Sequence, residues 1–312
     1  MLKTRVITAV VLLAVLLAAL FFLPPLGWAV FCALICALAA WEWGGLAGWG
    51  GKARVVYGIV LGCLCLTVSL GVVLDLETML ACEASLCLIA WALHELGLWV
   101  LALLFLLATL FWLLVVPFWL WRKWHLHSWV AAFVGVVVLI PPTLAFVWLR
   151  VNFSPWILLA VCALVWVADI AAYFSGRAFG GKKLAPNISP GKTWAGAFGA
   201  VIGVLVYGNV AWFAMGASRI NPFSVPWSEL HVLLLQVVFI VLAVWSIIGD
   251  LFESLLKRQA GVKDSSNLLP GHGGILDRID SLTSTLVFVF IFYVALSYVV
   301  FKFITPGYFI FK

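Results

Sequence analysis

The chain has 312 residues, of which 66% are hydrophobic and 10% are charged. A soluble domain is about half apolar and about a quarter charged, so this composition excludes an ordinary soluble globular domain. The formal net charge of +6 is more typical of basic loops beside a membrane than of nucleic-acid binding in so apolar a chain.

Long apolar runs predict an all-α, polytopic integral membrane protein with about nine transmembrane helices. The runs are continuous rather than alternating, which disfavours a β-barrel. The first run is about 18 residues long, with no small-residue cleavage site after it, so we interpret it as a spanning helix and not a signal peptide. The expected spans are 6–23, 26–44, 55–74, 96–121, 129–149, 156–175, 195–215, 231–252 and 283–304.

The run 79–94 is also apolar, but Glu83 and the pair His94-Glu95 interrupt that region. We expect a partly interfacial connection there. The seven cysteines lie mostly inside apolar runs and form no C-x-x-C pair. They are therefore expected to be buried small side chains, with neither a disulfide framework nor a zinc site.

The distribution of basic residues predicts the orientation. With nine spans and a cytoplasmic N-terminus, only Arg150, Arg219, Lys302 and Lys312 face the other side, so 14 of the 18 Lys and Arg residues are cytoplasmic. This matches the positive-inside rule. The long connections 176–194 and 253–282 are then both cytoplasmic.

Charged residues gather between Asp250 and Asp280, where nine of the chain's 30 charges fall. A solvated loop is the simplest explanation, but the charges begin inside a span. If that helix continues, Asp250, Glu253, Ser254 and Lys257 lie on one face. A carboxylate at the end of a membrane helix usually faces a polar cavity.

Two short motifs follow in the same stretch. Pro270-Gly271-His272-Gly273-Gly274 has the glycine content that close backbone approach to a phosphate requires, although a plain turn is an equal alternative. Asp277 and Asp280 are three residues apart, on one face of the next helix. Paired carboxylates suit Mg²⁺, whereas helix capping explains a single Asp.

A second polar cluster lies at 169–199. Asp169 is deep in a span, where an acid is either paired with a base or functional, and Tyr173 follows one turn later. Ser189-Pro190-Gly191-Lys192-Thr193 precedes an apolar helix, so Lys192 and Thr193 are expected to hold a phosphate at a helix start. Acids for a divalent cation and bases for phosphates favour phosphoryl or nucleotidyl transfer onto a lipid.

Three other classes of membrane protein fit the sequence less well. A transporter or channel would carry charges in several mid-membrane helices, and the N-terminal spans carry almost none. A polyprenyl-phosphate sugar-phosphate transferase usually has a DDxxD run, which is absent from the sequence. A CDP-alcohol phosphotransferase would show DGxxAR followed by GxxxDxxxD, which is also absent.

The anchors Ser254-x-x-Lys257-Arg258, Lys263-Asp264, His272-Gly273-Gly274 and Asp277-Arg278-x-Asp280 together resemble the signature of bacterial phosphatidate cytidylyltransferases, the CDP-diacylglycerol synthases. "GDLFES", "LAPNISPGKT" and "AAWEWG" at 39–44 also resemble the family, so the likeness covers nearly the whole chain. Ala195 and Ala200 depart from it, since relatives often have a polar residue and a glycine there.

The resemblance implies the reaction CTP + phosphatidate → CDP-diacylglycerol + pyrophosphate. It implies Mg²⁺ as cofactor, with a second metal ion left open, and membrane lipid but no nucleic acid as a partner. It also implies the cytoplasmic face of a bacterial inner membrane, with a homodimer left open. One continuous membrane domain is expected, with N-terminal helices in 1–150 and the catalytic region in 151–312.

The expected roles follow from the motifs and from the resemblance. The catalytic set is Asp277, Asp280, Lys263, Asp264 and Arg278. The substrate-binding set is Ser254, Lys257, Arg258, His272, Gly273, Gly274, Ser189, Lys192, Thr193 and Tyr173. The metal set is Asp277, Asp280, Asp250, Asp264 and Asp169.

Overall fold

The structure is a computed structural model that describes residues 2–78, 99–217 and 229–304. Within these ranges, nine helices are long and apolar enough to cross a membrane. This confirms the polytopic helical fold expected from the sequence. The connection expected at 79–94 lies outside the described residues, and the division of the chain at residue 150 stays a prediction.

The helices follow the expected order, with a small β-hairpin between two of them. The first half contributes α1 (Leu2–Phe22), α2 (Pro25–Leu46), α3 (Gly51–Thr78), a span over Trp99–Arg122 and α6 (Ser128–Asn152). The span over Trp99–Arg122 includes a π-helical turn, η1 (Phe111–Val115), followed by α5 (Val116–Arg122). The second half contributes α7 (Pro155–Phe179), β1 (Lys183–Ala185), β2 (Ser189–Thr193), α8 (Trp194–Ala217), α9 (Glu229–Gln259) and α10 (Leu276–Ile304).

Local sequence explains several of these boundaries. Pro25 and Pro155 occupy first-turn positions, where the missing N–H has no cost. Ser154 caps α7, because its Oγ accepts a hydrogen bond from the Trp156 N–H at 3.3 Å. Gly180, with φ +58°, ends the same helix.

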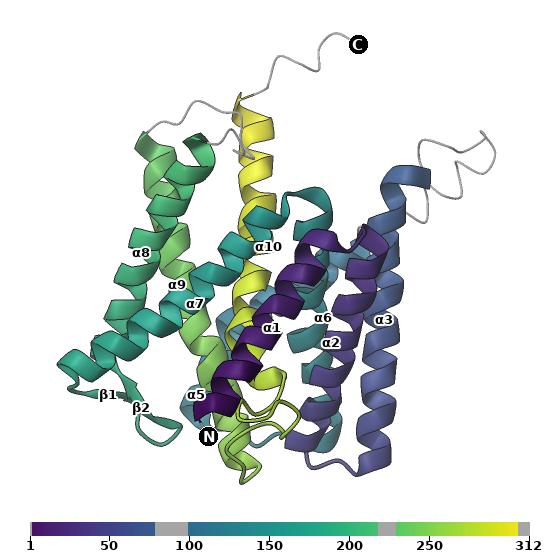
Figure 1. The fold of residues 1–312 in the computed structure, drawn as a ribbon, viewed down its shortest axis with the longest axis vertical. Coiled ribbons are helices and arrows are strands. Elements are labelled where there is room, and N and C mark those ends of the chain that lie inside the picture. Colours follow the sequence, from purple (N-terminus) through teal and green to yellow (C-terminus); the bar gives the residue numbers. More distant parts are fainter. Residues whose placement is uncertain (1, 79–98, 218–228, 305–312) are drawn as a thin grey trace.

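Helix α10 occupies the centre of the molecule (Figure 1). It contacts α9 and α7 on one side and α6 and α2 on the other. Helix α2 packs mainly on α3 and α6, and α7 packs mainly on α8. Residues at the start of α10 are therefore within reach of both groups of helices.

The polar connections gather at one end of the bundle. The N-terminus, the β1–β2 hairpin and the segment between α9 and α10 all lie at the lower end in Figure 1. The Gln259 side chain donates hydrogen bonds to the carbonyls of Lys123 (3.2 Å) and Trp124 (2.7 Å), which ties the end of α9 to the connection before α6. This end of the bundle holds most of the side chains expected to carry chemistry.

The end of α9 and the start of α10 differ from the expected span boundaries, and both changes affect the polar residues. Helix α9 continues to Gln259 and α10 begins at Leu276, so the expected connection 253–282 shrinks to the loop 260–275. The conditional expectation that Asp250 to Lys257 remain helical is confirmed. The segment 189–193 precedes an apolar helix, α8, as expected, but its own conformation was not predicted. It is strand β2, which pairs antiparallel with β1.

An aromatic cluster fixes the end of α9. Phe252 is almost fully buried, and its ring meets those of Trp43, Phe111, Trp112 and Trp119 with centroids 5.6–6.5 Å apart. Such aromatic pairs add stabilisation beyond their buried area. Because Glu253 follows Phe252 directly, this packing also sets the position of the first polar turn.

Small residues let neighbouring helices approach closely, as is common in membrane proteins. A Cβ built on Gly58 would lie 2.7 Å from the Ala37 carbonyl oxygen, at the contact of α3 with α2. A Cβ on Gly249 would lie 2.7 Å from the Asp280 carbonyl oxygen, at the contact of α9 with α10. Backbone atoms cannot move aside as a flexible side chain can, so these glycines determine the helix spacing.

The substitution Gly249→Ala is expected to push α9 away from α10. Overpacking of this kind costs about 1–3 kcal/mol, so the thermal unfolding midpoint in detergent should fall. Gly71→Ala is the matched control, because Gly71 is also helical and a Cβ there meets nothing within 4 Å. The control should unfold at or slightly above the wild-type temperature. Equal midpoints for the two variants would contradict the proposed close contact.

Candidate active site

A buried ion-pair network joins α9 to α10. The Lys257 ammonium lies 2.8 Å from Glu253 Oε2 and 2.6 Å from Asp277 Oδ1, and all three side chains are buried. Removing charges from water is expensive, and close pairing with good hydrogen bonds offsets that cost. Lys257, expected to bind substrate, is therefore engaged with the protein's own carboxylates.

Asp277 has hydrogen-bond partners on both carboxylate oxygens. Oδ1 accepts from Lys257, and Oδ2 accepts from the Ser265 N–H (2.8 Å), the Ser265 hydroxyl (2.8 Å) and the Gly274 N–H (2.7 Å). A carboxylate oxygen has few acceptor directions, and three donors occupy those of Oδ2. Asp277 therefore holds both ends of the segment 265–274 against α10.

Glu42 makes a second carboxylate anchor from α2. Its side chain is fully buried, with an exposed fraction of 0%. Oε1 accepts from the Ser266 hydroxyl (2.6 Å) and the Ile275 N–H (3.0 Å), and Oε2 accepts from the Leu276 N–H (2.7 Å) and the Ser265 hydroxyl (3.1 Å). These bonds satisfy the N–H groups of Ile275, the last loop residue, and of Leu276, the first residue of α10, and fix the loop to a helix far away in sequence.

The glycines of the PGHGG turn make room for these two carboxylates. Gly273 has φ +80°, and a Cβ there would lie 2.6 Å from Asp277 Oδ2. A Cβ on Gly274 would collide with Ser265 Oγ and the Glu42 carboxylate. The turn closes through a hydrogen bond from the Leu269 N–H to the Gly273 carbonyl at 2.8 Å. The glycines were expected to let the backbone lie close to a bound phosphate. In the structure they instead let it lie close to the carboxylates of Asp277 and Glu42.

The main polar cavity lies between α7, the hairpin, α8, α9 and α10, and has a volume of about 680 Å³. Its acids are Asp169, Asp250, Asp264, Asp277 and Asp280. Its bases are Arg177, Lys183, Lys192, Lys257 and Arg278, and Tyr173 also lines it. Acids and bases from five elements thus face a common space large enough for a nucleotide-sized ligand.

Three contacts order this cavity. Lys192 on β2 lies 2.5 Å from Asp250 Oδ2, which ties the hairpin to α9. Ser254 donates to Asp250 Oδ1 at 3.1 Å. On α7, the Arg177 guanidinium donates to the Tyr173 hydroxyl at 3.2 Å. Asp250 is therefore oriented from two sides before any ligand arrives.

A smaller polar cavity of about 450 Å³ adjoins the first. It is lined by Arg5, Lys263, Asn267 and residues 269–273, which include His272. Asp264 and Arg278 line both cavities. The two spaces therefore meet at Asp264 and Arg278.

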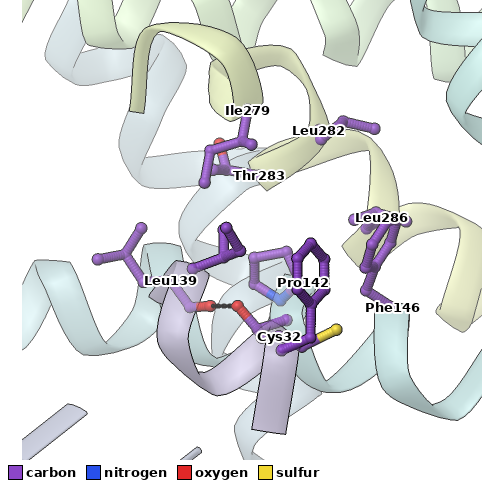
Figure 2. Close-up of a pocket in the computed structure, with 11 residues that line it drawn as sticks. Cys32, Leu139, Pro142, Phe146, Ile279, Leu282, Thr283 and Leu286 are labelled. Carbon is purple, nitrogen blue, oxygen red and sulfur yellow. Dashed lines mark hydrogen bonds between the residues drawn. The ribbon is translucent and has the colours of Figure 1, made fainter. Parts of the chain in front are cut away.

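A third cavity is apolar and lies deeper, between α2, α6 and α10. Figure 2 shows Cys32, Leu139, Pro142 and Phe146 around it, together with side chains from the first turns of α10. The Thr143 hydroxyl near it donates to the Leu139 carbonyl at 2.7 Å. Its lining suits hydrocarbon and not phosphate, so charged ligands are restricted to the two polar cavities.

The carboxylates of the main cavity have donor chemistry that fits Mg²⁺. Asp250 is near enough to Asp169 and to Asp280 to interact electrostatically with both. Among the described residues, no three His, Cys, Asp or Glu side chains form a metal cage by themselves. Mg²⁺ does not require one, because it binds through one or two carboxylates with waters and substrate phosphates.

The structure separates the predicted site residues into groups. The main cavity is lined by Asp169, Tyr173, Lys192, Thr193, Asp250, Lys257, Asp264, Asp277, Arg278 and Asp280. The smaller cavity adds Lys263, His272 and Gly273. Four predicted residues line neither polar cavity: Ser189, Ser254, Arg258 and Gly274.

These four residues have structural contacts instead. Ser189 pairs with Ala185 in the hairpin, and Arg258 donates to the Val262 carbonyl at 3.3 Å. Ser254 orients Asp250, and Gly274 donates to Asp277. Thr193 lines the cavity and also caps α8, since its Oγ1 accepts from the Gly196 N–H at 3.1 Å.

Glu42 is the residue that the sequence reasoning missed. A charged residue inside an apolar run is costly and usually has a role, so its position in "AAWEWG" was a usable signal. Ser265 and Ser266, the hydroxyl partners of Glu42, had no comparable signal. They lie in a polar loop where serine is common.

Fold and site together define a polytopic membrane enzyme with an acid- and base-lined cavity at one end of its helix bundle. A model of the cytidylyltransferase family matches residues 3–296. The chain belongs to the cytidylyltransferase family.

Curated relatives agree with this assignment. The phosphatidate cytidylyltransferase of Pseudomonas aeruginosa is 40% identical over 290 residues, covering 92% of this chain and 94% of the relative. That of Haemophilus influenzae is 35% identical over 306 residues, covering 94% and 99%. That of Bacillus subtilis is 41% identical over 129 residues, covering 41% and 44%.

The substitution Glu42→Ala should destabilise the protein strongly. It leaves the two buried N–H groups of Ile275 and Leu276 and the Ser266 hydroxyl without their acceptor, whereas the Ser265 hydroxyl keeps Asp277 Oδ2. Each unsatisfied buried group costs about 1–3 kcal/mol. We expect a large fall in the thermal unfolding midpoint in detergent. Glu42→Gln keeps the shape and one oxygen, so its midpoint should lie between those of wild type and Glu42→Ala. A wild-type midpoint for Glu42→Ala would show that the loop does not depend on this carboxylate.

Proposed function

We propose that the protein is a phosphatidate cytidylyltransferase that converts CTP and phosphatidate to CDP-diacylglycerol and pyrophosphate in phospholipid biosynthesis. One observation carries the proposal. Asp169, Asp250 and Asp280 share a cavity with Lys192 and Arg278 at one end of a bundle of membrane helices. Such a cavity offers bases for phosphates and acids for a cation at a position that a lipid headgroup can reach.

The chemistry requires positioning and charge neutralisation more than proton transfer. A phosphate oxygen of phosphatidate forms a bond to the α-phosphorus of CTP, and the bond from that phosphorus to the pyrophosphate oxygen breaks. The attacking phosphate is already an anion at neutral pH, so a strong general base is not required. Lys192 and Arg278, and Lys263 from the adjoining cavity, would lower the repulsion between the two anions.

Mg²⁺ is part of the proposal. Asp250, with Asp169 or Asp280, would hold it, and the bound ion would neutralise charge on the triphosphate. Asp264 faces both cavities and is a further candidate ligand. We leave Asp277 out of this set, because Lys257, Ser265 and Gly274 take up its oxygens.

The orientation and location are also proposals. The N-terminus, the hairpin and the loop 260–275 lie at one end of the bundle (Figure 1), and most basic residues of the chain fall on that side under the positive-inside rule. This supports an active site that faces the cytoplasm from a bacterial inner membrane. Membrane lipid is then both the solvent and a substrate, and a homodimer stays a prediction.

The activity is tested with purified protein, labelled CTP, phosphatidate in detergent micelles and Mg²⁺. We expect labelled CDP-lipid and pyrophosphate in equal amounts, and no product when Mg²⁺ is removed with a chelator. Protein that neither binds CTP nor forms CDP-lipid under these conditions would reject the proposed function.

Two asparagine variants test the division between the acids. Asp280→Asn should lower kcat by roughly 100-fold, as loss of one transition-state contact commonly does, and should raise the Mg²⁺ concentration needed for half-maximal rate. Asp277→Asn should lower the unfolding temperature, because it weakens a buried pair with Lys257. Its half-maximal Mg²⁺ concentration should stay near the wild-type value.

The opposite pattern would contradict the metal assignment. If Asp277→Asn shifts the Mg²⁺ dependence and Asp280→Asn does not, the cation is held by Asp277 and the network around it rearranges on binding.

A further inference from the structure

The start of α1 lies against the glycine-rich turn. The Thr8 hydroxyl donates to the Pro270 carbonyl at 2.9 Å. A Cβ built on Gly271 would lie 3.1 Å from Arg5 Cγ, so the Arg5 side chain crosses directly over the turn. Gly271 has φ +76°, which favours glycine on backbone grounds as well. Two residues of the first helix thus contact a loop from the other end of the sequence.

This contact closes one side of the smaller polar cavity. Arg5, Lys263 and Arg278 bring three positive charges to a space of about 450 Å³, against one carboxylate from Asp264. Within the described ranges, none of these three bases forms an ion pair within 4.0 Å. The cavity therefore carries an excess of positive charge that the protein itself does not neutralise.

His272 adds a polar group to the same space. It lines the cavity, and its buried Nδ1 has no hydrogen-bond partner in the part of the chain that the structure describes. Buried polar atoms nearly always have a partner, so a ligand or water is expected at this nitrogen. Guanidinium, ammonium and imidazole groups around one space match the oxygens of a phosphate group.

We propose that the cavity binds a phosphate group of a substrate, and that Arg5 of α1 is one of its ligands. The inference rests on the proposed function, which brings two phosphate-bearing substrates to the site. Asp264 and Arg278 line this cavity and the main one, so a phosphate here lies next to the reacting groups. The shared chemistry has two sources: the pyrophosphate portion of CTP, or the phosphate of phosphatidate.

Steady-state kinetics of Arg5→Ala distinguish the two sources. Loss of a charge-assisted hydrogen bond should raise one KM by about 10-fold or more, with a smaller effect on kcat. A higher KM for CTP and weaker inhibition by pyrophosphate assign the cavity to the nucleotide. A higher KM for phosphatidate in mixed micelles assigns it to the lipid.

Lys3→Ala is the matched control. Lys3 is a cation on the same first turns of α1, and it does not line the cavity. Both KM values of the control should equal those of wild type. If the two variants behave alike, the effect of Arg5 comes from the general charge of α1 and the subsite proposal is wrong.

Binding measurements keep the proposal testable apart from the activity. Pyrophosphate and a short-chain, water-soluble phosphatidate are titrated calorimetrically into wild type, Arg5→Ala and Arg5→Lys. Weaker binding of at least one probe to both variants supports the site, even if wild type forms no CDP-lipid. Arg5→Lys keeps the charge but loses the planar fork, so its loss should be the smaller one. Unchanged affinity for both probes in folded variants would overturn the proposal.

Discussion

The loop 260–275 is held in place by two buried carboxylates, Glu42 on α2 and Asp277 on α10. Each accepts hydrogen bonds from backbone N–H groups and hydroxyls of the loop and the start of α10, and Asp277 also binds Lys257. A buried carboxylate without partners is energetically costly, so these hydrogen bonds strongly favour this one conformation of the loop. Because this loop forms much of the smaller cavity and contributes Asp264 to the main one, both cavities depend on these bonds.

Burial divides the acids into two kinds. Glu42, Glu253 and Asp277 are buried and directed at the protein's own donors or at Lys257. Asp169, Asp250 and Asp280 face the main cavity. The first kind shapes the site, and the second kind is available to a cation brought by a nucleotide. This division explains why so apolar a chain concentrates its charges in a few segments.

The sequence was informative wherever the relevant contacts are local. Continuous apolar runs predicted nine spans, and helical spacing predicted the shared face of Asp250, Ser254 and Lys257, because both depend on neighbours within one helix. The place of segment 189–193 before an apolar helix was predicted, but its strand conformation was not, because this β-hairpin is stabilised partly by tertiary contacts, here the ion pair of Lys192 with Asp250. Local propensity cannot report such a contact.

The roles of Glu42 and Arg5 also depend on tertiary contacts that local sequence patterns do not report. The partners of Glu42 lie more than 220 residues away, and no local pattern connects them. Arg5 was only one of the 14 basic residues expected in the cytoplasm, because its place over the PGHGG turn follows from the path of α1 across the bundle. In both residues, a side chain of the first helices completes a site whose recognisable motifs lie near the other end of the chain.

A structure of the protein with CTP and Mg²⁺ bound tests the central claim most directly. The account predicts that the triphosphate lies where the two polar cavities meet, at Asp264 and Arg278, with the cation bound to Asp250 and to Asp169 or Asp280. It also predicts that Glu42 and Asp277 keep their hydrogen bonds to the loop. A nucleotide bound outside these cavities, or a cation held by Asp277 with the loop released, would contradict it.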